Sequence, residues 1–87
     1  MTRTLRWSER ANHDLARMPA DVSERIVITV DRWAATGHGD FAPLRNVHGA
    51  THRLRVGRMW RVLLSLDEEA RTATVRRVLA RGAEYRP

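Results

Sequence analysis

A helical pattern follows a short alternating stretch at the start of the chain. The alternation over residues 3–7 predicts a first strand, and Ser8 is a residue type that favours the N-cap of a helix. Apolar residues then recur at spacings of four and three up to Met18, directly before Pro19. The pattern predicts a short amphipathic helix, with Trp7 placed to pack against its first turn.

A second helix is predicted from Asp21 to the residues before Gly37. Glu24 lies three residues after Asp21, which gives the spacing of a capping box, and Gly37 is a natural helix end. The β-branched run 26–30 would also suit a strand, but the end signals and the helical period favour a helix. The apolar positions that share one face of this helix are Val22, Ile26, Val30 and Trp33.

The second half of the chain predicts a basic antiparallel meander. Residues 38–51 contain two glycines and a proline and are expected to form an ordered surface loop. Three strands follow over 52–56, 59–66 and 72–86, joined by turns at Gly57-Arg58 and at 67–69. Within these strands arginine alternates with valine and leucine, which predicts one apolar and one cationic sheet face. The predicted fold is α+β: an N-terminal strand, a two-helix hairpin and a three-stranded antiparallel meander, in a single domain over residues 1–87.

The charge of the chain favours a polyanionic partner. All 16 basic residues are arginine, and the formal net charge is +6. Arginine clamps phosphate well but is a poor proton shuttle, because it is effectively never deprotonated. The chain has no cysteine and no metal-ligand spacing among its histidines, so we expect no metal and no cofactor. No run of about 18 apolar residues or apolar signal core occurs, so we expect a cytoplasmic protein without a membrane span.

The order of several short motifs resembles the RelE/ParE toxin superfamily, and in particular its short RelE-like members. The motifs that carry the resemblance are residues 7–11, 43–49, 53–57, 60–62 and 78–86. The resemblance implies a toxin of a toxin–antitoxin pair, held inactive by a cognate acidic antitoxin. RelE-like members cleave mRNA on the ribosome, and ParE-like members inhibit DNA gyrase without being enzymes. A third reading is a degenerate toxin that mainly binds its antitoxin.

By this resemblance Arg61, Arg81 and Tyr85 are the candidate catalytic residues. Arg61 would stabilise the scissile phosphate, since extra negative charge develops there when a ribose 2′-hydroxyl attacks. The alternatives are a structural arginine paired with Asp40 or Glu84. Arg81 would be a second phosphate clamp, or else an edge-strand arginine that deters strand pairing. Tyr85 would stack on a base or assist proton transfer, or else cover the sheet edge.

Arg53, Arg55 and Arg58 are the candidate RNA-binding residues. Arg53 and Arg55 are two apart in a strand and therefore share a face, where they would attract the RNA backbone. The alternative is a role near the attacking hydroxyl. His52 is the nearest conventional base, but the alternation places it on the opposite face. Relatives often have Gly-His before the last arginine of the site, where this chain has Leu79-Ala80. Without that histidine, cleavage would depend on electrostatics and positioning.

Overall fold

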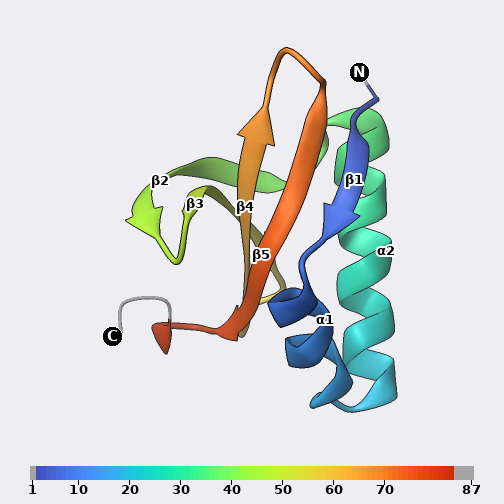
Figure 1. Ribbon diagram of the computed structural model, residues 1–87. Coiled ribbons are helices and arrows are strands. Elements are labelled where there is room, and N and C mark those ends of the chain that lie inside the picture. The colour runs from blue at the N-terminus through green and yellow to red at the C-terminus, as the bar shows by residue number, and fades with distance from the viewer. Residues whose placement is uncertain (1, 84–87) are drawn as a thin grey trace.

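The structure is a computed structural model that describes residues 2–83, apart from the side chain of Asn46. Two helices and five strands follow one another along the chain (Figure 1). In chain order they are β1 (Thr4–Trp7), α1 (Glu9–Ala16), α2 (Ala20–Thr36), β2 (Asp40–Val47), β3 (Ala50–Val56), β4 (Trp60–Asp67) and β5 (Thr72–Ala80).

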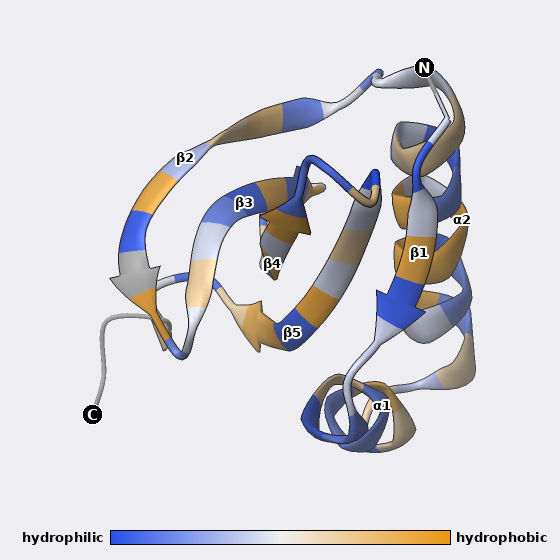
Figure 2. Cartoon of the chain, turned by 45° about the horizontal axis from the view of Figure 1, so that its top comes forward, coloured by the Kyte–Doolittle hydropathy of each residue, from blue (hydrophilic) through white to orange (hydrophobic). Residues whose placement is uncertain are grey.

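All five strands form one mixed sheet in the order β1-β5-β4-β3-β2. The meander from β2 to β5 is antiparallel, and β1 pairs in parallel with β5 at the far edge. Both helices lie on one side of the sheet beside β1 and β5, whereas the β2–β3 hairpin curls away from them (Figures 1 and 2). The predicted α+β fold is therefore confirmed, with one strand more than the sequence suggested.

The extra strand corrects the prediction of a loop over residues 38–51. Residues 40–47 instead form the edge strand β2, paired with β3 from Asp40↔Arg55 to Val47↔Ala50. A proline is tolerated in an edge strand because one side of that strand makes no ladder hydrogen bonds. The register shifts between Pro43 and Val47, so the strand accommodates Pro43 at an irregularity. The prediction for the last strand was also wrong at its end, because β5 stops at Ala80; residues 84–86 lie outside the described residues.

Both helices form where the hydrophobic period predicts them. Ser8 caps α1, since its Oγ accepts a hydrogen bond from the backbone N–H of Ala11 at 3.1 Å. Gly37 ends α2 in the left-handed conformation, with φ of 80°. The expectation that Asp21 caps α2 is wrong: the helix begins at Ala20 after Pro19, and no side chain caps it. Asp21 lies in the first turn, where its charge still meets the positive end of the helix.

The core lies between the helices and the near face of the sheet. Ile26, Val30 and Trp33 from α2 are buried there, so the β-branched run is helical because tertiary packing outweighs local propensity. Trp7 and Trp60 pack against this core. The strand residues buried with them are Leu54, Val56, Val62, Leu64, Ala73, Val75 and Val78.

A bulge in β5 interrupts the alternation of its side chains. Leu63 pairs with Arg77, but the next residue of β4, Leu64, pairs with Val75, so Arg76 is an extra residue. In a bulge two residues oppose one, and the strand no longer alternates strictly between faces. Val75 and Val78 both lie in the core, and the two arginines between them both turn away from it.

Asp14 anchors α1 to β5. Its carboxylate accepts hydrogen bonds from Arg77 Nε at 2.8 Å, from Arg77 Nη2 at 3.2 Å and from the backbone N–H of Val78 at 2.9 Å. The N–H of Val78 lies on the edge of β5 beyond the end of β1, where no strand of the described residues pairs with it. Asp14 is therefore part of the packing between α1 and β5, and its side chain is only 12% exposed.

Arg3 and Glu68 form an exposed ion pair between the start of the chain and the β4–β5 turn. The hydrogen bond from Arg3 holds the pKa of Glu68 below its ordinary value of 4.5. A lowered pKa means that the pair stabilises the fold above pH 4.5, and that this contribution is lost as the pH falls through the folded-state value. We expect Arg3→Gln to raise the pKa of Glu68 toward its ordinary value in an NMR titration; an unchanged pKa would show that the pair does not persist in solution.

Within the described residues, neither helix is both long and apolar enough to cross a membrane.

Candidate nucleic-acid interface

The sheet surface that faces away from the helices carries a run of arginines. Residues directly opposite in neighbouring strands share a face, and the register gives the rows Asp40–Arg55–Arg61–Leu79 and Ala42–Arg53–Leu63–Arg77. We call this surface the outer face. Leu63 is fully buried and Arg61 is 9% exposed, so these two residues form its floor. The predicted cationic sheet face is therefore present.

Four of the predicted site residues line one hollow of about 270 Å³ at the end of the outer face. Arg55 enters it from β3 and Arg61 from β4. Arg58 comes from the β3–β4 turn, and Arg81 is the residue directly after β5. We call it the arginine hollow; its lining residues are Asp40, Arg55, Gly57, Arg58, Arg61 and Arg81. The sequence brings these residues together because the β3–β4 turn and the end of β5 lie at the same end of the antiparallel meander.

Two local features position these arginines. Gly57 has a φ of 60°, a left-handed conformation that lets the chain turn tightly between Arg55 and Arg58. The backbone N–H of Arg81 donates to the carbonyl of Met59 at 2.6 Å, which holds the end of β5 against the same turn. The backbone around the hollow is thereby fixed on both sides.

Arg61 is the most enclosed of the four. Its Nη1 donates to the carbonyl of Trp60 at 3.3 Å, and its side chain lies at the floor of the outer face. A guanidinium in this position stays charged, and because its environment is partly shielded from water its field acts strongly on any anion in the hollow.

Asp40 brings a carboxylate into this cationic site. Its Oδ1 lies 3.4 Å from Arg53 Nη1 and its Oδ2 lies 3.7 Å from Arg55 Nη1. Arg53 is therefore next to the arginine hollow without lining it. Sequence reasoning named Asp40 only as an alternative partner for Arg61. Its link to Arg53 and Arg55 depends on the pairing of β2 with β3, and the residues of β2 were expected to form a loop.

The hollow can bind an anion but offers little for proton transfer. Among the described residues that line it, Asp40 has the only side chain able to accept a proton, and no histidine is present. His52 lies on the helix-side face, as the alternation predicted, where its ring stacks on Phe41 with centroids 5.0 Å apart. Tyr85 and Glu84 lie outside the described residues. The described residues also contain no group of three or more side chains suited to a metal ion.

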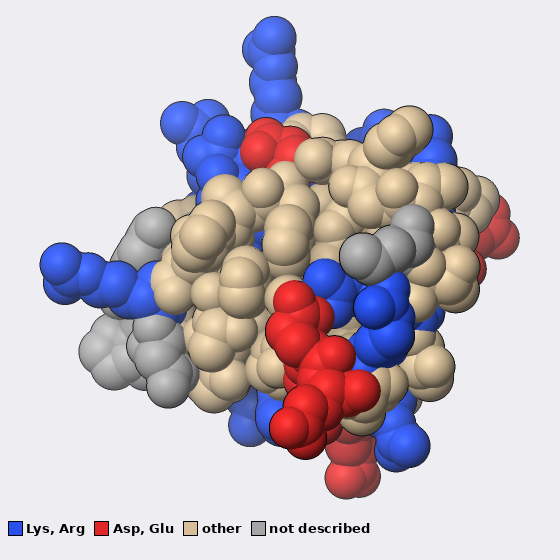
Figure 3. All heavy atoms as spheres, turned by 90° about the horizontal axis from the view of Figure 1, so that it is seen from above, with Lys and Arg blue, Asp and Glu red and all other residues tan. Residues whose placement is uncertain are grey.

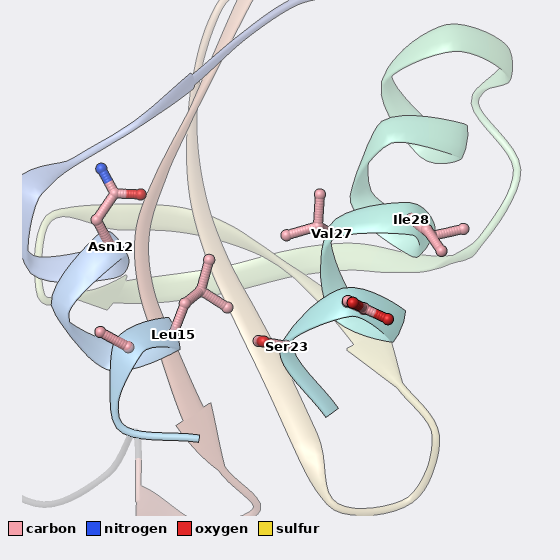
Figure 4. A pocket seen from close by; sticks show the side chains of 7 residues that line it. Asn12, Leu15, Ser23, Val27 and Ile28 are labelled. Carbon is pink, nitrogen blue, oxygen red and sulfur yellow. The ribbon is translucent and has the colours of Figure 1, made fainter. Parts of the chain in front are cut away.

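A hollow of a different kind lies between the two helices. It measures about 470 Å³, and Figure 4 shows Leu15 of α1 opposite Val27 of α2 across it. Its lining is mainly apolar, and its one charged residue is the acidic Glu24. Such a surface does not suit a phosphate, so the arginine hollow is the better candidate for an anion.

Comparison with solved structures places the chain in a known fold. It is similar to a chain in the toxin–antitoxin complex RelBE2 from Mycobacterium tuberculosis, with a TM-score of 0.79 and 24% identity over 93% of both chains. It is also similar to a chain in the RelE–RelB complex from Pyrococcus horikoshii, with a TM-score of 0.74 and 18% identity over 94% of this chain and 98% of that one.

A third similar structure is the RelB–RelE antitoxin–toxin complex from Methanococcus jannaschii, with a TM-score of 0.69 and 21% identity over 94% of this chain and 99% of that one. Neither models of protein families nor curated proteins match the sequence. The chain therefore has the fold of RelE toxin structures, as the sequence motifs implied.

Proposed function

We propose that this chain, which has the RelE fold, is the toxin of a toxin–antitoxin pair. The solved structures of similar fold are toxin–antitoxin complexes, and the similarity extends over nearly the whole of each chain. The net charge of +6 suits an acidic antitoxin as the partner. Growth arrest on induction of the gene, relieved by co-expression of a neighbouring acidic protein, tests this proposal. Normal growth on induction would favour the degenerate toxin.

The activity that the site supports best is cleavage of mRNA on the ribosome. The observation that carries this proposal is the arginine hollow, which joins four guanidinium groups in a space large enough for a phosphate. Arg61 and Arg81 would hold the scissile phosphate, while Arg53, Arg55 and Arg58 bind the RNA backbone beside it. Tyr85 would stack on a base or assist proton transfer.

The chemistry would be an attack of a ribose 2′-hydroxyl on the adjacent phosphate. The 2′-hydroxyl loses its proton as its oxygen bonds to phosphorus. The bond from phosphorus to the 5′-oxygen breaks and this oxygen gains a proton, which leaves a 2′,3′-cyclic phosphate and a 5′-hydroxyl. Negative charge grows on the phosphate oxygens in the transition state, where fixed guanidinium groups stabilise it more than they stabilise the ground state. A site so poor in proton-transfer groups is expected to act slowly, and to depend on the ribosome for the geometry of the attack.

A gyrase inhibitor of the ParE kind is the second candidate. The observation in its favour is that no histidine lines the arginine hollow, so the described part of the site has no conventional general acid. Against it stands the short helical hairpin, in which α1 has only eight residues, whereas ParE-like chains usually have a longer one. A DNA supercoiling assay separates the two candidates.

Asp40→Asn tests whether the outer face attracts RNA through its charge. The change removes a negative charge from the site and frees Arg53 and Arg55 from their carboxylate partner. We expect RNA to bind about 3–10-fold more tightly, because the exposed partner is worth about 1 kcal/mol. Fluorescence anisotropy with a short single-stranded RNA measures this change. Equal or weaker binding by the variant would contradict an electrostatic role for these arginines.

A further inference from the structure

We propose that a second phosphate-binding site for single-stranded RNA, separate from the arginine hollow, lies where the outer face meets α1. This inference rests on the proposed action on RNA and extends it to the path of the strand. The site is a hollow of about 280 Å³ lined by Ser8, Arg10, His48, Arg76 and Arg77, which we call the second hollow.

The second hollow exists because of the bulge in β5. In a regular strand Arg76 and Arg77 would point to opposite faces, and one of them would enter the core. The extra residue at Arg76 turns both guanidinium groups outward. Arg76 Nε donates to Ser65 Oγ at 2.9 Å, which positions its guanidinium while its two terminal nitrogens remain available for a ligand.

Four separate parts of the fold supply the lining. Arg10 belongs to α1, and Ser8 lies directly before that helix. His48 lies in the β2–β3 turn, and the two adjacent arginines belong to β5. No carboxylate lines this hollow among the described residues. Arg77 is balanced by Asp14, so the unbalanced charge comes from Arg10 and Arg76. Cations that converge from different elements, without an acid between them, form a site suited to a phosphate.

The second hollow lies at the edge of the outer face, where β5 meets α1, and β4 connects it to the arginine hollow. Arg61 and Ser65 are four residues apart in β4, which corresponds to about 13 Å along the strand. Arg53 and Leu63 lie between these two positions on the outer face. A positively charged groove that follows the backbone is the usual way in which proteins bind single strands.

Acidic residues mark the end of this path. The β4–β5 turn lies at the top of Figure 1, and the next hollow in that direction is lined by Asp67 together with Arg6 and Arg76. Seen from above, acidic side chains gather in a cluster at this end of the molecule (Figure 3). Acidic side chains are thus concentrated beyond Arg76, so we assign the second hollow to a phosphate a few nucleotides from the scissile one.

The test compares two lengths of RNA on the whole protein. One RNA is a dinucleotide that fills the arginine hollow alone, and the other is a seven-nucleotide strand; both carry 2′-O-methyl groups so that they are not cleaved. NMR titration gives the Kd of each RNA for wild type, Arg10→Gln and Arg76→Gln. Arg32→Gln, an exposed arginine of α2 on the helix side, is the matched control for loss of one charge.

We expect Arg10→Gln and Arg76→Gln each to weaken binding of the longer RNA about 5-fold and to reduce its salt slope by about 0.7, while the dinucleotide binds as before. Arg32→Gln should change neither. Equal effects of all three variants, or equal losses for both RNA lengths, would overturn the second site and leave the proposed function intact. A wild type that binds neither RNA would overturn both the second site and the action on RNA.

Discussion

Replacing Arg61 by glutamine is expected to reduce mRNA cleavage on programmed ribosomes by about 10²–10³-fold. Fixed donors aimed at the developing charge of a transition state typically contribute this much. Arg61 is the group for which the largest loss is expected, because it lies at the floor of the outer face and lines the arginine hollow. The rate of appearance of the cleaved mRNA, measured with excess toxin, gives the effect on the chemical step.

The structural alternative for Arg61 needs its own control. Because Arg61 is buried, its loss could also destabilise the sheet, so the unfolding midpoint of the variant has to be measured beside its activity. Arg32→Gln on the helix side should keep both activity and stability. A folded Arg61→Gln variant that cleaves within 3-fold of wild type would make Arg61 a structural residue (about 0.6 kcal/mol in the barrier).

Replacing Asp14 by alanine is expected to destabilise the protein by about 2–3 kcal/mol. The change leaves Arg77 and the N–H of Val78 without their acceptor in a part-buried position. Urea unfolding followed by circular dichroism measures the loss. The exposed Glu9 of the same helix provides the control, since Glu9→Ala should stay within about 0.5 kcal/mol of wild type.

The Asp14–Arg77 pair should stabilise the fold equally throughout the neutral range. The hydrogen bond with Asp14 raises the pKa of Arg77 above its ordinary value. A raised pKa gives a contribution that is fully present below the unfolded-state value and is lost only as the pH rises through the folded-state value. For Arg77, the loss of this stabilising contribution therefore occurs far above neutral pH. An Asp14→Ala variant as stable as wild type would show that the pair does not hold α1 on β5.

Much of the fold follows from short-range patterns. Ser8 and Gly37 mark helix ends through backbone chemistry that needs no tertiary context, and the meander follows from alternation broken at Gly57. The strand β2 was missed because Pro43 and two glycines indicate a loop locally. This strand forms because it pairs with β3, and a pattern of neighbouring residues carries no information about that pairing.

The site was predictable only where alternation holds. Arg53, Arg55 and Arg61 share a face as the period of two requires, and the turn adds Arg58. The bulge at Arg76 breaks this period, so the second hollow could not be seen in the sequence. The anchoring role of Asp14 could not be predicted from local patterns either, because its partners, Arg77 and Val78, lie more than 60 positions further along the chain.

Incubation of the purified protein with mRNA on programmed ribosomes tests the central claim most directly. The account predicts a new mRNA cut that needs the ribosome, that ends in a 2′,3′-cyclic phosphate, and that is lost in Arg61→Gln. Intact mRNA together with inhibition of DNA supercoiling would contradict it and assign the cationic outer face to a different target.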